Sequence, residues 1–232
     1  SIANSSGIAF ASGAGVGTFD ISQTNSGASV AGLNDTVGGS VVSLGAKTLT
    51  ITGNRGPYDG VIQDGGIGGG TGGNVTIASG GLATFGGVNT YTGLTTISGG
   101  GQLDLTSGGS IASSKAVIND GTFDISRAGG GVSINSLSGT SIFGAVNLGA
   151  NTLTFTNANG TFAGTIRDGG AGGGVTITGG KEVLTGINTY TGSTTINGGT
   201  LEVDGSIANS LKVTVNSGGT LSGTGTVGSG LV

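Results

Sequence analysis

The sequence contains no cysteine, methionine, tryptophan or histidine, a single proline, and few charged residues. The absence of cysteine excludes disulfide bridges and thiolate chemistry; it fits a chain that stays unfolded during export, although many cytosolic proteins also lack cysteine. Only 8% of the residues are charged, and the seven basic residues are spread along the chain, whose formal net charge is −4. Because no basic patch is available to neutralise phosphates, we do not expect nucleic acid as a partner.

Long hydrophobic runs are also missing from the sequence. No stretch of 18 apolar residues occurs, so we expect no membrane-spanning helix and no direct insertion of this segment into a membrane. No signal peptide is present, and Ser1 and Val232 both fall inside repeated sequence, which predicts that the chain is a piece of a longer protein.

Glycine is abundant, with 56 residues among 232. It does not recur at every third position, which excludes a collagen helix. Glycine interrupts every window of about ten residues and costs about 1 kcal/mol at each position inside a helix, so we expect almost no helix. Apolar residues make up 34% of the chain and occur in short alternating runs, which is enough for a core and argues against disorder.

A long internal repeat organises the chain. Gly87–Gly100 and Gly186–Gly199 are identical at eleven of fourteen positions, and Ser-Ile-Ala occurs at the start of each repeated unit. A match of this length marks a structural repeat. We therefore divide a single domain, residues 1–232, into a unit of residues 1–109, a unit of residues 110–205 and a partial unit of residues 206–232.

Short alternating runs predict strands with one buried face and one wet face. These runs are Thr48–Thr52, Asn74–Ile77, Gln102–Leu105, Thr122–Ile125, Thr152–Phe155, Thr200–Val203 and Lys212–Val215. A finer period lies inside the long repeat, because Gly101–Leu105 returns twenty residues later as Gly121–Ile125. A period near twenty, with glycine and asparagine at the corners, predicts an all-β parallel β-helix (solenoid) in which each coil stacks on the previous one.

The solenoid hypothesis makes definite statements about the core. Roughly eleven coils spaced by about 4.8 Å would give a rod on the order of 50 Å long, with Leu103 close to Phe123. The side chains expected to face inward are Leu49, Ile51, Val75, Ile77, Leu103, Leu105, Phe123, Ile125, Leu153, Phe155, Ile177, Ile196, Leu201 and Val203. A sandwich of antiparallel hairpins, with turns at Asp120-Gly121, Asn159-Gly160 and Asn197-Gly198, is the alternative, but it gives no reason for a twenty-residue period.

Two glycine-rich runs, residues 65–73 and 169–174, follow Asp64 and Asp168. The segment Asp64–Asn74 is four residues longer than its match Asp168–Gly174, and an insertion of that size inside a strand would shift its register. We therefore expect both runs to be solvent loops, with Asp64 and Asp168 accepting backbone N–H bonds at the turns.

The glycine runs lack the context of known ligand-binding motifs. Gly68, Gly70 and Gly73 have the spacing of a dinucleotide-binding loop, but no strand–helix context or downstream acid accompanies them. Gly180-Lys181 is followed by Glu182, whereas a phosphate loop needs serine or threonine there. Neither run contains an aspartate after its start, as calcium-binding glycine repeats require. We expect no cofactor and no metal.

Carboxylates near basic residues are the candidates for catalysis. They are Asp59 and Asp64 near Arg55, Asp168 beside Arg167, and Asp120 and Asp124, four residues apart across a glycine turn. Polysaccharide-cleaving β-helices use clustered carboxylates, commonly beside lysine or arginine. With no histidine or cysteine and about one acidic residue per coil, we favour turn capping over catalysis and expect no enzyme activity.

Threonines and tyrosines recur in both units. Thr-x-Thr pairs start at Thr48, Thr90, Thr152 and Thr189, but an ice-binding array needs such a pair on every coil, so we favour β-branched packing on an exposed pleat. Tyr91 and Tyr190 share one position in the two units. A surface tyrosine could stack on a sugar, but we expect both to pack over the coil edge with the hydroxyl wet or bonded to a turn.

The repeated motif resembles a known family. The motif is Gly186–Gly199, and it runs on into Gly-Thr-Leu at residues 199–201. It is similar to the autotransporter-associated β-strand repeat of bacterial type V autotransporter passenger domains. Tyr58–Gly66 and Phe162–Gly170 resemble the usual lead-in of that family. The core matches cover about residues 58–105 and 162–203, whereas residues 78–86 and 178–186 depart from the usual family pattern.

The resemblance implies a right-handed parallel β-helix, displayed on or released from the outer surface of a Gram-negative-type cell. It implies a longer passenger that continues into a C-terminal outer-membrane β-barrel. The family has no catalytic residues that could be assigned to positions of this sequence. A solenoid without cysteine suits coil-by-coil folding after export through a narrow pore.

We therefore expect a structural, surface-displayed stalk or adhesin segment that supports adhesion or self-association, with a host or matrix surface ligand or further copies of itself as partners. One alternative is a polysaccharide-binding or polysaccharide-cleaving β-helix. Another is a self-assembling fibre subunit, because a solenoid cut within a repeat leaves unpaired strand edges.

Overall fold

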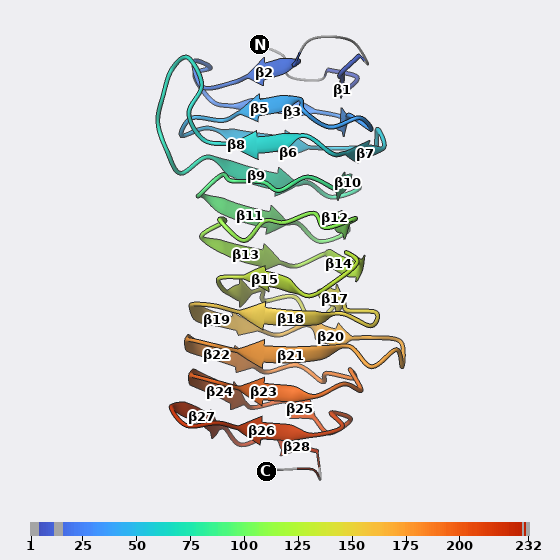
Figure 1. The fold of residues 1–232 in the computed structure, drawn as a ribbon, viewed down its shortest axis with the longest axis vertical. Coiled ribbons are helices and arrows are strands. Elements are labelled where there is room, and N and C mark those ends of the chain that lie inside the picture. The colour runs from blue at the N-terminus through green and yellow to red at the C-terminus, as the bar shows by residue number, and fades with distance from the viewer. Residues whose placement is uncertain (1–4, 12–15, 229, 231–232) are drawn as a thin grey trace.

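The computed structural model describes residues 5–11, 16–228 and 230. In this part of the chain the regular elements are all β-strands, and there is no helix that is long and apolar enough to cross a membrane. The strands stack one above another along the long axis of an elongated molecule (Figure 1). The prediction of an all-β solenoid is confirmed.

Consecutive coils pair in parallel at a spacing of about twenty residues. β10 (Leu82–Phe85) pairs with β12 (Gln102–Thr106), and β12 pairs with β14 (Thr122–Arg127). Leu103 lies directly beside Phe123, as the sequence predicts. The other strand pairs of the described residues are parallel too, so the antiparallel sandwich is wrong.

Each coil visits three faces in turn. Face A contains β3 (Ala28–Val30), β6 (Thr48–Ile51), β9 (Asn74–Ile77), β11 (Leu94–Ile97), β13 (Ala116–Asn119) and β16 (Leu137–Ser138), and continues with β19 (Ala158–Phe162), β22 (Gly180–Leu184), β24 (Gly199–Val203) and β27 (Gly219–Ser222). Face B contains β1 (Ile8–Ala9), β4 (Leu33–Asn34), β7 (Pro57–Tyr58), β10, β12, β14, β17 (Ala145–Asn147), β20 (Thr165–Arg167), β25 (Ser206–Ile207) and β28 (Thr226–Val227). Face C contains β2 (Thr18–Asp20), β5 (Val41–Ser43), β8 (Val61–Gln63), β15 (Val132–Ile134), β18 (Thr152–Phe155), β21 (Gly174–Ile177), β23 (Thr194–Ile196) and β26 (Val213–Val215).

The sequence repeat does not return to the face on which it began. β10 and β12 of the first unit lie on face B, whereas their equivalents in the second unit, β22 and β24, lie on face A. Likewise, β11 lies on face A and its equivalent β23 on face C. The repeat unit is therefore not a whole number of coils, and equivalent residues of the two units point in different directions.

The core consists of side chains stacked along the axis. All the side chains expected to face inward are buried, with at most 1% of their surface exposed. Leu49 of β6 pairs with Val75 of β9, and farther along the same face Val117 of β13 pairs with Leu137 of β16. Burial of each such side chain contributes about 1.5–3 kcal/mol, so these ladders hold successive coils together.

The strand bounds differ little from the predicted runs. Thr52 and Lys212 fall just outside β6 and β26, and β14 extends two residues beyond Ile125. These differences occur at strand ends, where the chain turns a corner and alternation of apolar and polar residues no longer constrains it.

Glycines let the backbone of one coil approach the next at a corner of the solenoid. A side chain at Gly186 would collide with the carbonyl oxygen of Gly164, and a side chain at Gly205 would collide with that of Gly186. A side chain at Gly164 would likewise collide with the carbonyl oxygen of Gly144, and a side chain at Gly225 with that of Gly205. Part of the high glycine content is therefore explained by contact of backbone with backbone.

Candidate functional site

Asp64 follows β8 and caps the first glycine loop. Its carboxylate accepts hydrogen bonds from the backbone amides of Gly72 and Gly73, at 3.1 and 2.9 Å, and from the Thr92 hydroxyl at 2.6 Å. Within the loop, the amide of Ile67 donates to a carboxylate oxygen of Asp20 on face C at 2.7 Å. The loop is exposed, as expected, but it leans back over earlier coils (Figure 1).

Asp168 follows β20 and has the same role in the second unit. It accepts hydrogen bonds from the amides of Gly170, Gly172 and Gly173 and from the amide and hydroxyl of Thr191. Burial by itself would raise the pKa of Asp168, but these donors stabilise the carboxylate and lower its pKa to about 2. The turn-capping interpretation of Asp64 and Asp168 is confirmed.

The other candidate carboxylates are engaged separately. Asp120 accepts hydrogen bonds from the amides of Thr140 and Ser141, and Asp124 accepts them from the amide and hydroxyl of Ser126. Asp120 is therefore bonded to the next coil, whereas Asp124 is bonded within its own turn and also accepts a hydrogen bond from the side-chain amide of Asn147 of the next coil at 3.0 Å. The two aspartates share no hydrogen-bond partner among the described residues.

The candidate arginines do not join these carboxylates. Arg167 donates from Nε to Asn147 at 2.7 Å, and Arg55 packs over Gly7 and Gly32. The ion pairs of the described residues are Arg127 with Asp104 and Lys181 with Glu202, so Asp59, Asp64 and Asp168 have no arginine partner there. In the same part of the chain, no group of three acidic, histidine or cysteine side chains is placed to hold a metal.

The asparagine of the repeated motif joins three successive coils. Asn89 accepts a hydrogen bond from the Ile62 amide of the previous coil at 2.9 Å, and donates to Gly87 of its own coil and Ser110 of the next. In the second unit, Asn188 repeats all three contacts with Ile166, Gly186 and Ser206. Both side chains are buried. The sequence interpretation missed this role, although identity of the residue in both units was a signal.

The tyrosines of the motif are buried, and the expectation that they pack over the coil edge is wrong. Tyr91 and Tyr190 have 0% and 1% of their surface exposed. The Tyr91 hydroxyl lies 2.6 Å from Oγ1 of Thr95, which donates to Ser114, which in turn donates to the carbonyl of Gly93. Burial raises the pKa of both tyrosines well above the ordinary value of 10. Neither ring is available to stack on a sugar.

The same hydrogen-bonded chain occurs in the second unit. The Tyr190 hydroxyl lies 2.7 Å from Oγ1 of Thr194, and Thr194 lies 2.9 Å from the Ser210 hydroxyl, which donates to the carbonyl of Gly192. These hydroxyls satisfy one another inside an apolar interior, where an unpaired polar group would be costly. The repeated motif is therefore built to connect coils.

The threonine pairs do not form one flat array. The pair beginning at Thr48 lies on β6 of face A, whereas the equivalent pair beginning at Thr152 lies on β18 of face C. Their side chains are half-buried, as expected for an outward pleat. In the other two pairs, Thr92 and Thr191 donate to the capping aspartates described above.

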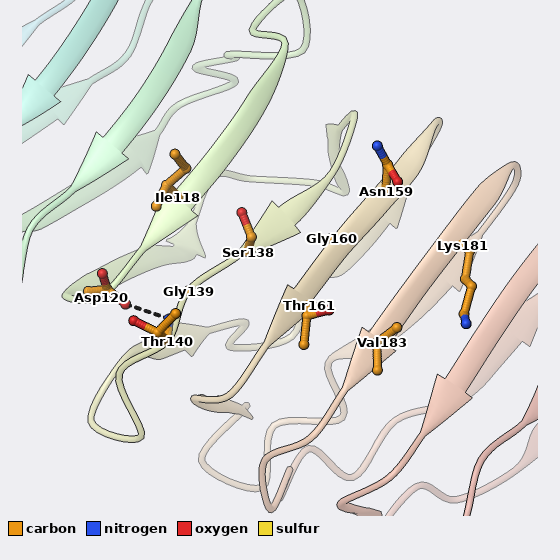
Figure 2. Close-up of a pocket in the computed structure, with 10 residues that line it drawn as sticks. All are labelled: Ile118, Asp120, Ser138, Gly139, Thr140, Asn159, Gly160, Thr161, Lys181 and Val183. Atoms are coloured by element: carbon orange, nitrogen blue, oxygen red, sulfur yellow. Dashed lines mark hydrogen bonds between the residues drawn. The ribbon is translucent and has the colours of Figure 1, made fainter.

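A groove of about 370 Å³ lies on the outer side of face A, over β13, β16, β19 and β22. Figure 2 shows polar side chains from neighbouring strands with Gly139 and Gly160 between them. The residues that line it are Ile118, Asp120, Ser138, Gly139, Thr140, Asn159, Gly160, Thr161, Lys181 and Val183. Sequence reasoning did not find this groove, because its walls come from four coils and no single motif marks it.

Glu182 lies on β22 between two residues that line the groove, but its side chain points into the core. It has 0% of its surface exposed, and within the described residues neither carboxyl oxygen forms a hydrogen bond. Burial raises its pKa to about 8; the nearby amides of Leu137 and Gly160 and the Ser136 hydroxyl moderate the rise without bonding to it. The sequence did contain a signal for this burial: Glu182 and Leu184 are two residues apart on one strand, so their side chains point to the same side.

The chain is similar to one autotransporter adhesin over a limited stretch. A segment of 86 residues, 35% of this chain, is 45% identical to the adhesin BmaC autotransporter of Brucella suis biovar 1 (strain 1330). The chain spans about 2% of the length of that relative. No family model matches the chain, and no solved structure matches it either. The adhesin match and the solenoid fold together fit a passenger β-helix of an autotransporter.

Proposed function

We propose that this chain, which fits the passenger β-helix of an autotransporter, is a surface-exposed, adhesin-like segment that acts as a structural stalk. The observation that carries the proposal is the 86-residue match to an autotransporter adhesin on a chain that folds as a parallel solenoid. We further propose that the parent protein is exported through the outer membrane and carries its membrane β-barrel elsewhere in its sequence.

The internal construction supports a stalk. Asn89 and Asn188 each join three coils, Asp64 and Asp168 fix the corner loops, and aliphatic ladders run along the interior. A solenoid of this kind is held together by contacts between neighbouring coils, so its length can grow without a change in its cross-section. Such a rod places whatever it carries at a distance from the cell.

The role as a surface segment can be tested on intact cells that express the parent protein. Antibodies raised against the purified chain should label these cells without permeabilisation, and external protease should remove the label. Deletion of the segment should reduce attachment of the cells to host or matrix surfaces. Labelling that appears only after permeabilisation would contradict the proposal.

We propose that the segment has no catalytic activity. The support is that four of the five candidate carboxylates are held by separate sets of donors, from their own turn or from the next coil, and that none of the five pairs with a candidate arginine in the described structure. Incubation of the purified chain with a panel of bacterial and host polysaccharides should release no new reducing ends and no unsaturated products. Release of either would favour a polysaccharide-cleaving β-helix instead.

Self-association is a second candidate function, favoured by one exposed loop. Ile142 and Phe143, between β16 and β17, have 71% and 87% of their surfaces exposed, which is unusual for adjacent large apolar residues. Sedimentation of the chain over a range of concentrations should show association that weakens in an Ile142→Ser, Phe143→Ser variant. A monomer at all concentrations would contradict self-association and a fibre-forming role.

A further inference from the structure

We propose that the groove on face A binds a neutral, hydroxyl-rich glycan. The groove spans four coils and has a volume of about 370 Å³, within the range of about 300–1,000 Å³ typical of small-ligand sites. Gly139 and Gly160 line its middle, between polar side chains of neighbouring strands (Figure 2).

The polar groups of the groove suit sugar hydroxyls. Ser138, Thr140, Asn159 and Thr161 all line it, and no hydrogen bond within the described residues engages the side chain of any of them. Hydroxyl and amide groups both donate and accept, which matches the hydrogen-bonding pattern of a sugar hydroxyl. Ile118 and Val183 add apolar surface at the edges, against which the C–H groups of a sugar ring can pack.

The charges around the groove are already compensated, so a charged ligand has no advantage. Lys181 pairs with Glu202 at 2.7 Å, and Asp120 accepts hydrogen bonds from the amides of Thr140 and Ser141 at 2.8 and 2.9 Å. A polyanion would have to displace Glu202 from Lys181. A polycation would have to compete with backbone amides for Asp120. The local electrostatics therefore favour a neutral glycan over an acidic one.

The groove does not suit an extended peptide. Peptides that add to a sheet use the free N–H and C=O groups of an edge strand. β13 is paired with β16, β19 is paired with β22, and a parallel bridge between Gly139 and Phe162 joins β16 to β19, so the groove offers no long unpaired strand edge in the described structure. A ligand must therefore bind through side chains, which again favours a glycan.

The first unit supplies an internal comparison. At the repeat-equivalent place on face B, Asn34 and Arg55 line a depression of about 280 Å³ with Ser6, Gly7, Ile8 and Ala9. Arg55 occupies the position equivalent to Asn159, and its side chain packs over Gly7 and Gly32. The first depression is therefore partly filled and carries a cation. The second is open and neutral, so we assign glycan binding to the second unit.

The proposal names a class of ligand for the adhesive role proposed above. Its biological meaning rests on that role, but binding of a glycan to the purified chain does not. Binding is measured on the purified chain with short gluco-, manno- and galacto-oligosaccharides as neutral probes. Polygalacturonate fragments, sulfated oligosaccharides and an extended peptide serve as comparators. Surface labelling of cells tests the adhesive role separately, so failure of one result is distinguishable from failure of the other.

We expect at least one neutral probe to bind, with NMR shift changes centred on Ser138, Asn159 and Thr161. Asn159→Ala and Thr161→Val should each weaken that binding about fivefold to tenfold, because each removes hydrogen bonds to the ligand. Asn159→Arg, which copies the first unit, should weaken it further by filling the groove. Thr176→Val, a matched change on the outer side of β21, should leave affinity unchanged.

Because Asn159 and Thr161 are exposed, we expect each variant to remain folded. The unfolding midpoint of each variant checks this. The proposal is overturned if no neutral probe binds, if the Asn159 and Thr161 variants bind as tightly as the parent chain, or if the acidic probes or the peptide bind in preference to the neutral ones.

Discussion

Glu182 on β22 lies in register beside Gly160 on β19, and Leu201 follows it on β24. The inward row of face A therefore contains a carboxyl group next to a residue with no side chain. The equivalent residue of the first unit is Ala83, which is also buried. Glu182 fills space that an alanine would leave, at the cost of burying an acid that has no hydrogen-bond partner in the described structure.

This arrangement predicts that the free energy of unfolding falls as the pH rises. The pKa of Glu182 is about 8 in the folded chain, above its ordinary value of 4.5. Between these values the unfolded chain releases a proton that the folded chain keeps. The contribution of Glu182 is complete below about pH 4.5 and is lost as the pH rises to about 8, with a slope approaching about 1.4 kcal/mol per pH unit. Urea unfolding at several pH values measures this slope.

Two variants separate Glu182 from other groups. Glu182→Gln cannot titrate, so most of the slope between pH 4.5 and 8 should disappear. Lys181→Gln changes the exposed neighbour on the same strand and should keep the slope. If Glu182→Gln keeps the parent slope, another group carries the pH dependence and the buried carboxyl is not responsible.

Removal of the asparagine that joins three coils should be strongly destabilising. Asn188→Ala leaves the Ile166 amide and the carbonyls of Gly186 and Ser206 without their side-chain partner. The Ile166 amide becomes unsatisfied, at a cost of about 1–3 kcal/mol, and each carbonyl loses one of its two donors, so we expect a total loss of roughly 2–4 kcal/mol in urea unfolding. Asn197→Ala, at an exposed position after β23, should cost much less. Equal losses would mean that Asn188 does not join the coils.

The coil pairing was predictable because it depends on local pattern. Leu103 and Phe123 alternate with polar neighbours and recur at the coil period, so both the inward direction and the stacking could be read from the sequence. The rotation of the second unit onto a different face could not be read in this way. It depends on how many corners the chain turns between Gly87 and Gly186, and corners carry no apolar alternation.

The candidate site was predictable only in part. Asp64 and Asp168 were identified as caps, since aspartate before a glycine run has few other roles. Tyr91 was misplaced, because it lies outside the strands, just before the bend at Gly93, where alternation does not say which side faces inward. Glu182 was missed, because glutamate is rarely buried and its alternation with Leu184 was outweighed by its charge. The groove needed the three-dimensional stacking of four coils.

The tyrosines offer a spectroscopic check of the interior. The chain has three tyrosines and no tryptophan, and all three tyrosines are buried. Burial raises the pKa of Tyr58 to about 12 and those of Tyr91 and Tyr190 above the ordinary value of 10. At about pH 11 the folded chain should show little tyrosinate absorbance, whereas the chain in denaturant should be largely ionised. Tyrosinate formation near pH 10 in the folded chain would place these rings at the surface.

The glycine column at the corner of the solenoid predicts a contrast between two alanine substitutions. At Gly186 the added methyl group would meet the carbonyl oxygen of Gly164, which is backbone and cannot rotate away. The coil must shift to relieve the collision, and we expect a loss of roughly 2–4 kcal/mol in the free energy of unfolding. At Gly130 the same methyl group meets no atom within 4 Å, so the change should stay within about 0.5 kcal/mol.

The contrast also bears on why the repeated motif begins with glycine. Gly186 and Gly87 hold the same position in the two units, and a side chain at Gly87 would likewise meet a backbone carbonyl, that of Gly60. Gly87→Ala should therefore be as costly as Gly186→Ala, although the two glycines lie on different faces. A small loss of unfolding free energy at either position would show that the backbone at the corner can shift to accommodate a methyl group. A large effect at both would mean that the first residue of the motif is required for contact between coils and not for a ligand.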